Sequence, residues 1–108
     1  MSDCTTHQAE TICSSPQELE KQANFFKALG HPVRLAIVEM LLGGERCVCE
    51  LHENSQRDMS TISSHLKSLK AAGVISSEQR GKNIYYSLCC PCVALVLGAI
   101  RKNVCKTL

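Results

Sequence analysis

The chain has 108 residues, a formal net charge of +2, eight cysteines and only four aromatic side chains. This length predicts one domain with a modest aliphatic core, and no stretch has the roughly 18 apolar residues that a membrane-spanning helix needs. The start of the chain is polar and acidic, without the apolar segment of a signal peptide. So many cysteines without an export signal favour a cytoplasmic protein whose reduced thiols bind metal or do redox work.

Two helices are predicted after a flexible, cysteine-containing tail at residues 1–15, and residues 16–108 are predicted to form one folded domain. Ser15 and Pro16 are typical of a helix N-cap and a first helical position, and Gly30 is typical of a helix end. The first helix has an apolar stripe at Leu19, Ala23, Phe26 and Leu29. The second helix, which begins at His31-Pro32, has one at Leu35, Val38, Leu41 and Leu42.

A short third helix is predicted over residues 46–55 and a fourth over residues 59–72, with Asp58 as the N-cap of the fourth and Gly73 as its end. The inward stripe of the fourth helix consists of Ile62, Leu66 and Leu69. Its other surface is rich in hydroxyls and lysines, which suit the base edges and phosphates of DNA. The predicted DNA contacts on this surface are Ser60, Thr61, Ser63, Ser64 and Lys67. His65, at the edge of the stripe, is predicted to be a hydrogen-bonded packing residue.

A β-hairpin with a glycine-containing turn is predicted over residues 74–88. Arg80 and Lys82 flank the glycine at its tip, where two cations can lie against the DNA backbone or in the minor groove. A last helix begins at Pro91, and its first two turns are apolar nearly all round, which suits a dimer interface. The second half of the chain is basic, as expected of a protein with an anionic partner.

The order of four helices, a hairpin and a final helix predicts a mainly α (α+β) fold. It is the winged helix-turn-helix, with the hairpin as the wing and a C-terminal dimerisation helix. Four motifs in this order resemble the ArsR/SmtB family: FFKALGHPVRLAIVEMLL, ERCVCEL, MSTISSHLKSLKAAGVI and RGKNIYYSL. The resemblance runs from about residue 22 to the end of the chain. It departs at Gln56, where the family usually has a glycine, and at Ser55, where it often has an aliphatic residue.

The resemblance implies a homodimeric repressor that leaves its operator when a metal or metalloid binds. It places residues 59–72 in the major groove of double-stranded operator DNA, makes the hairpin the wing, and assigns the first and last helices to the dimer interface. Neither a membrane nor a small organic substrate is expected as a partner.

Two groups of cysteines, each at the predicted start of a helix, are the predicted metal ligands: Cys47 with Cys49, and Cys90 with Cys92. Soft thiolates select thiophilic ions over hard cations. At a helix N-terminus the positive end of the helix dipole is expected to lower the pKa of a thiol. Cysteines at i and i+2 of an ideal helix point about 200° apart, so Cys47 and Cys49 are expected to hold one ion only if the helix start is distorted.

The ligands that would complete these sites stay open. In arsenite-responsive members of the family a third cysteine follows the CVC motif where this chain has His52, and in cadmium- and lead-responsive relatives an N-terminal cysteine tail folds onto this helix. Zinc sensors of the family have an Asp-x-His pair at the positions of Cys90 and Cys92. The partner positions of that pair are Asn103 and Lys106 here, which cannot complete such a zinc site. The residues left open as further ligands are Cys4, Cys13, His52, Cys89 and Cys105.

The predicted function is a transcriptional repressor released by a thiophilic ion, with As(III) first and Cd(II), Pb(II), Zn(II) and Sb(III) as alternatives. A repressor of the same fold that responds to thiol oxidation or persulfides is the second hypothesis. The third is an enzyme with Cys49 and His52 as nucleophile and base. It lacks a carboxylate with an evident orienting role and room for a substrate cleft, so no catalytic residue is predicted. The fourth is a metal-trafficking protein without DNA binding, which a gel shift on the protein's own promoter would exclude.

Overall fold

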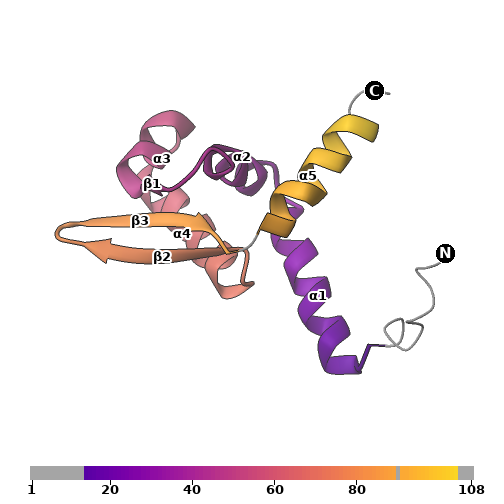
Figure 1. Cartoon of the computed structure of the whole chain (residues 1–108). Coiled ribbons are helices and arrows are strands. Elements are labelled where there is room, and N and C mark those ends of the chain that lie inside the picture. The colour runs from indigo at the N-terminus through magenta and orange to yellow at the C-terminus, as the bar shows by residue number, and fades with distance from the viewer. Residues whose placement is uncertain (1–13, 90, 105–108) are drawn as a thin grey trace.

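The computed structural model describes residues 14–89 and 91–104, which form five helices and three strands. In chain order these elements are α1 (Pro16–Leu29), α2 (Pro32–Leu41), β1 (Arg46–Cys47), α3 (Val48–Ser55), α4 (Met59–Ala71), β2 (Ile75–Arg80), β3 (Asn83–Leu88) and α5 (Pro91–Asn103). In Figure 1 the hairpin of β2 and β3 projects from one end of the molecule, and α1 and α5 lie at the other. The predicted winged helix-turn-helix is confirmed. None of the helices in the described ranges has the length and hydropathy needed to cross a bilayer.

Side chains just before the helices explain where α1 and α2 begin. The backbone N–H of Glu18 donates to Ser15 Oγ (3.1 Å), and the N–H of Ser15 donates to Glu18 Oε1 (2.8 Å), which together form a capping box. The imidazole of His31 caps α2 by accepting from the N–H of Val33 at Nδ1 (3.1 Å). These contacts use backbone donors that the first turn leaves unpaired, so the predicted starts of α1 and α2 are confirmed.

The three strands form one antiparallel sheet in the order β1-β3-β2. The predicted hairpin is confirmed, and it pairs from Ile75 opposite Leu88 to Arg80 opposite Asn83. The strand β1 was not predicted: Arg46 and Cys47 were assigned to the third helix, but they pair with β3 and the helix begins at Val48. A segment of two residues is too short to show the alternating hydrophobicity of a strand, and its partner strand lies almost 40 residues further along the chain.

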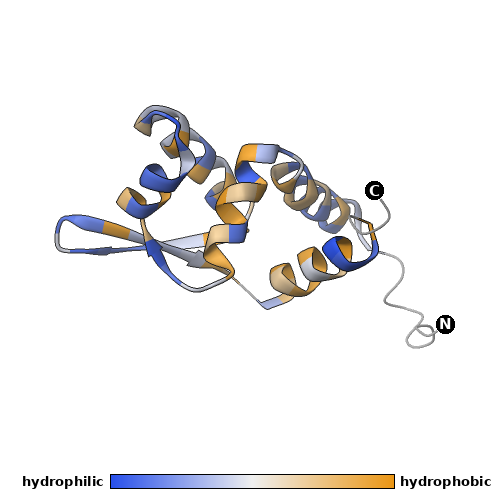
Figure 2. Cartoon of the chain, turned by 90° about the horizontal axis from the view of Figure 1, so that it is seen from above, coloured by the Kyte–Doolittle hydropathy of each residue, from blue (hydrophilic) through white to orange (hydrophobic). Residues whose placement is uncertain are grey.

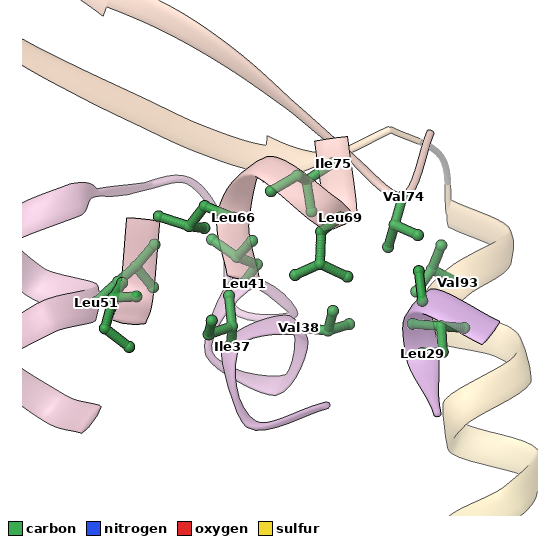
Figure 3. Close-up of a cluster of buried hydrophobic side chains, with 12 residues drawn as sticks. Leu29, Ile37, Val38, Leu41, Leu51, Leu66, Leu69, Val74, Ile75 and Val93 are labelled. Carbon is green, nitrogen blue, oxygen red and sulfur yellow. The ribbon is translucent and has the colours of Figure 1, made fainter. Parts of the chain in front are cut away.

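One cluster of aliphatic side chains, drawn from all five helices and the start of the hairpin, forms the core (Figure 3). The predicted inward stripe of α4 is confirmed, because Ile62, Leu66 and Leu69 are at most 1% exposed. From α5, Val93 is fully buried in this core and Leu97 packs against it. The core therefore fixes which face of α4 points outward.

Two predicted apolar stripes differ from the observed burial. Of the α1 stripe only Leu29 is buried, whereas Leu19 and Phe26 are 55% and 59% exposed in the single chain. Helix α1 meets the rest of the chain at its C-terminal end and extends away from it, so its earlier turns have no core to pack on (Figure 1). In α2, Leu42 follows the last helical residue and is exposed, and Ile37 takes a fully buried place that was not predicted.

Helix α3 ends in a strained conformation. Gln56 is the C-cap of α3, with φ 60° and ψ 25°, and it is the one non-glycine residue with positive φ in the described chain. A side chain in this left-handed region costs roughly 1–2 kcal/mol, which glycine avoids. The departure from the family at this position therefore places glutamine where the turn between α3 and α4 needs a glycine-like backbone.

Replacing Gln56 with glycine should stabilise the chain. The relief of left-handed strain exceeds the extra backbone entropy that glycine loses on folding, so the free energy of unfolding should rise by about 0.5–1 kcal/mol. Urea or thermal unfolding measures this change. The matched control is Gln56→Ala, which keeps a Cβ and with it the strain. Equal unfolding midpoints for the glycine and alanine variants would contradict this explanation.

Helices α2 and α4 also meet through a histidine pair. The rings of His31 and His65 have centroids 4.5 Å apart, and Arg34 donates from Nε to Nδ1 of His65 (3.2 Å). His65 therefore acts as an acceptor in its neutral form, which confirms its predicted role as a hydrogen-bonded packing residue. Burial, aided by His31, Arg34 and Arg57, lowers the pKa of His65 below its ordinary value of 6.5.

This pKa shift predicts a loss of stability in mild acid. Between the lowered pKa and 6.5 the unfolded chain binds the proton of His65 more readily than the folded chain does. Stability should hold above pH 6.5 and fall as the pH drops below it. Urea unfolding at about pH 7.5 and about pH 5.5 should show a smaller loss for His65→Gln than for wild type. A His52→Gln control, outside this cluster, should behave as wild type, and equal losses in all three proteins would refute the assignment.

Candidate nucleic-acid interface and metal centre

The outward face of α4 carries most of the predicted DNA contacts side by side. A shallow groove between α4 and β3 is lined by Ser60, Ser63, Ser64, Leu66, Lys67, Lys70 and Tyr86. Ser63, Ser64 and Lys67 are exposed, and their side chains make no hydrogen bond to any other described residue. They are therefore available to base edges and phosphates.

The first turn of α4 uses its hydroxyls differently. Asp58 stands at the N-cap, and Ser60 donates from Oγ to its Oδ2 (2.7 Å). Hydrogen bonds from the side chains of Thr61 and Ser60 lower the pKa of the Asp58 carboxyl below its usual range. Of the five predicted contacts on α4, Ser60 and Thr61 thus interact with the Asp58 carboxylate, and Thr61 does not line the groove.

The two cations at the tip of the wing differ in their surroundings. Arg80 forms a bidentate pair with Glu45, Nη1 and Nη2 each lying 2.7 Å from a carboxylate oxygen, and Nη2 also donates to Glu78 (2.8 Å). The guanidinium carbon lies 4.8 Å from the centre of the Tyr85 ring. These carboxylates, with Glu45 first, raise the pKa of Arg80. Lys82 is exposed and has no hydrogen-bond or ion-pair partner within residues 14–89 and 91–104.

The thiol of Cys47 is near enough to that of Cys49 to act on its pKa. Cys47 is the N-cap of α3, with φ −80° and ψ 159°, so its side chain does not follow the helical rotation that separates residues i and i+2. The backbone N–H of Cys47 donates to Glu50 Oε1 (3.1 Å), which fixes this start of the helix. Cys47 is buried and Cys49 is exposed. The backbone at Cys47 therefore departs from an ideal helix, which is the condition that a shared ion on Cys47 and Cys49 requires.

One electrostatic expectation for this pair is wrong. The hydrogen bond with Cys47, then burial, then the charge of Cys47 raise the pKa of the Cys49 thiol, although the backbone N–H groups of Cys49 and Glu50 act in the opposite sense. The second sulfur of a close pair opposes the second negative charge more strongly than the helix end favours it. A soft cation that binds both sulfurs removes this repulsion, because its charge compensates both thiolates.

No third ligand joins this pair among the residues that the structure describes, because no three Cys, His, Asp or Glu side chains gather there in a metal-binding arrangement. The possible set of Cys47, Cys49 and His52 is not formed, and neither Cys89 nor Cys92 joins the pair. Cys92 is the second residue of α5, and its sulfur is in a disulfide. Four other cysteines named from the sequence lie outside the described residues: Cys4, Cys13, Cys90 and Cys105.

Glu45 is the residue of this region that sequence reasoning missed. It lies in the loop before β1 and contacts Arg80, which is 35 residues further along the chain. No local pattern marks such a pair, because an exposed glutamate beside a glycine turn is typical of any solvated loop. Only the pairing of β1 with β3 brings the loop to the wing.

Comparison with known proteins agrees with this arrangement. A family described as bacterial regulatory protein, arsR family, matches residues 31–77, from the cap of α2 into β2. An uncharacterised HTH-type transcriptional regulator of Methanocaldococcus jannaschii is 40% identical over 72 residues, which cover 65% of this chain and 81% of that protein. A probable mercury resistance operon repressor of Streptomyces lividans is 36% identical over 86 residues, which cover 80% of this chain and 66% of that protein.

Solved structures share the whole fold. The crystal structure of Rv0081 from Mycobacterium tuberculosis has a TM-score of 0.76 and 34% identity, with 87% of this chain and 94% of that chain covered. The solution structure of a homodimeric winged helix-turn-helix DNA-binding domain of Mycobacterium bovis, a possible ArsR-family transcriptional regulator, has a TM-score of 0.74 and 27% identity over 82% of this chain and 85% of that chain. These similar proteins are transcriptional regulators and not enzymes. With its helix-turn-helix, its wing and these relatives, the chain belongs to the ArsR/SmtB family of winged-helix transcriptional regulators.

Proposed function

We propose that this regulator is a repressor that holds operator DNA as a homodimer and leaves it when a thiophilic ion, arsenite first, binds Cys47 and Cys49. The observation that carries the proposal is the adjacent thiol pair at the N-cap of α3, the helix that precedes α4 in the helix-turn-helix. Two neighbouring sulfurs at the start of α3 could both bind As(III), Cd(II), Pb(II), Zn(II) or Sb(III), all of which accept thiolate ligands. A third ligand would come from Cys4, Cys13 or the partner subunit.

The DNA interface of the proposal has α4 in the major groove and the wing beside it. Ser63, Ser64 and Lys67 would contact DNA directly, and Ser60 and Thr61 would do so from the capped first turn of the helix. Lys82 would neutralise a phosphate, as would Arg80 once it exchanges its carboxylate partners for DNA. Ion binding would fix the start of α3, so that the two α4 helices of the dimer are held in a spacing that does not match the operator.

The apolar surface of α5 supports dimerisation. Leu95 is 73% exposed, and Ile100 and Val104 are also exposed large apolar residues. Figure 2 shows α5 as mostly hydrophobic up to its basic last turn. An exposed stripe of this kind on a single chain is typical of a surface that a partner covers. We assign the dimer interface to α1 and α5, at the end of the molecule away from the wing (Figure 1).

Removing the wing cation at Lys82 tests the DNA interface. Lys82→Ala should weaken binding to specific and unrelated duplexes alike, because a phosphate contact carries no sequence information. The slope of log affinity against log salt should fall by about one unit for each protomer's lost contact. Fluorescence anisotropy with labelled operator DNA measures both effects. Lys21→Ala on α1, checked by gel filtration to form the same dimer as wild type, is the control of equal charge, and an identical salt slope for the two variants would contradict the wing contact.

An ion panel tests the sensing site. Operator release by As(III), Sb(III), Cd(II), Pb(II) and Zn(II), measured under reductant, should be lost in Cys47→Ser/Cys49→Ser while affinity for DNA without ion is retained. The matched variant is Cys90→Ser/Cys92→Ser, which tests the second proposed cysteine group at the start of α5. Full responses in both double variants would remove the proposed sites. No release of wild type by any of these ions would remove the function itself.

A redox or persulfide response is the second candidate function, and the disulfide of Cys92 favours it. A sulfur that forms a disulfide in the folded chain is able to switch between two covalent states. Release by peroxide or polysulfide that is reversed by dithiothreitol, without release by arsenite, would select this function over ion sensing.

A further inference from the structure

The wing and the cysteine-bearing segment are held together by side chains as well as by backbone. Arg80 lies at the end of β2, yet its bidentate partner Glu45 belongs to the loop that leads into β1. Glu78, its other partner, is a neighbour on β2 itself. One guanidinium thus joins a carboxylate of the wing to a carboxylate two residues before Cys47.

The backbone reinforces this link. Cys47 pairs with Tyr85 and Arg46 with Tyr86, so β1 is an edge strand of the sheet that forms the wing. Tyr85 also lies under the guanidinium of Arg80. On the other side, Arg46 donates from Nε to the carbonyl of Met40 (3.0 Å), which anchors the segment to the end of α2. Movement of Cys47 is therefore transmitted to β3 and to the loop that carries Glu45.

Glu45 and a DNA phosphate would compete for the same donors. Carboxylate and phosphate both bind the two terminal nitrogens of a guanidinium in a bidentate manner. In the DNA-free chain Glu45 takes both Nη1 and Nη2 of Arg80. A phosphate that uses these donors must displace Glu45, so pairing with Glu45 and binding of DNA by Arg80 exclude each other.

We propose that Glu45 is a positioning residue that couples the thiol pair to the wing by withholding Arg80 from DNA. An ion on Cys47 and Cys49 holds segment 45–49 in the arrangement in which Glu45 binds Arg80, and DNA binding requires that this pair open. The inference rests on the proposed ion-sensing function and adds a route through β1 and the wing. Because such coupling is reciprocal, operator DNA weakens ion binding by the same factor.

The test compares Glu45→Gln with Glu78→Gln. Each variant removes one negative charge beside Arg80, so each should tighten operator binding without ion by a similar factor of about two to three. Only Glu45→Gln breaks the link to the cysteine segment. Operator affinity is measured by anisotropy with and without sodium arsenite, or with Cd(II) if wild type responds to Cd(II) instead. Binding of the ion without DNA is followed by its thiolate charge-transfer absorption.

The expected result is a change in the ratio of operator affinities without and with ion. Glu45→Gln should reduce this ratio by about threefold relative to wild type, as befits an exposed ion pair, while Glu78→Gln keeps the wild-type ratio. Ion affinity without DNA should stay within about twofold of wild type in both variants. Circular dichroism checks that both variants are folded.

Three outcomes would overturn the inference. Equal ratios in Glu45→Gln and Glu78→Gln, with a wild type that responds, would show that Glu45 carries no coupling and would leave the proposed function intact. A larger loss of ion affinity in Glu45→Gln would place Glu45 at the ion itself. A wild type released by no ion would remove the proposed function together with the coupling.

Discussion

The burial of one stripe of α4 is the constraint on which the other features of this molecule depend. Ile62, Leu66 and Leu69 are packed into the cluster shared by all five helices, and each such side chain contributes about 1.5–3 kcal/mol when fully buried. Once these three positions face inward, helical geometry turns Ser63, Ser64 and Lys67 outward on the opposite side. The side chains of Ser63, Ser64 and Lys67 make no hydrogen bond within the described residues, so their orientation follows the packing of α4 against α2, α3 and the hairpin. A bound ligand that shifts α3 or the hairpin would therefore change the surface against which α4 packs.

Cys47 has three structural roles because it stands at a boundary between a strand and a helix. The extended backbone of an N-cap is compatible with strand pairing, so the same residue pairs with Tyr85 and caps α3. Because Cys47 precedes the first helical residue, its side chain is not rotated away from Cys49 as it would be in an ideal helix, and its thiol acts on the pKa of Cys49. A ligand bound to these sulfurs would therefore lie where the sheet joins the helix-turn-helix. This position explains how a small ion could influence both parts of a DNA-binding surface.

The charges of the wing follow from the same junction. Lys82 extends beyond the sheet without a partner in the described chain, whereas Arg80 is held by two carboxylates over an aromatic ring. Both residues are basic and exposed, and the sequence does not distinguish them. Because exposed ion pairs are weak and screened by salt, the ion pairs of Arg80 favour the closed arrangement only slightly and can open reversibly. A pairing of this strength is compatible with the proposed exchange of the carboxylates for a DNA phosphate.

The local sequence by itself determined the helix starts at Ser15 and Asp58, the buried stripe of α4 and the glycine-containing turn of the hairpin. Capping, helical periodicity and glycine conformation act over a few residues, and they are legible in one chain. The four ordered motifs likewise sufficed for the winged helix-turn-helix. Only the tertiary structure decided that Arg46 and Cys47 form a strand, that the thiols of Cys47 and Cys49 meet, that the pKa of Cys49 rises, and that Glu45 holds Arg80. Each of these depends on a partner brought close by folding or on an exact backbone angle at one residue. A pattern of residue types along the chain records neither, because it contains no distances between segments that are far apart in sequence.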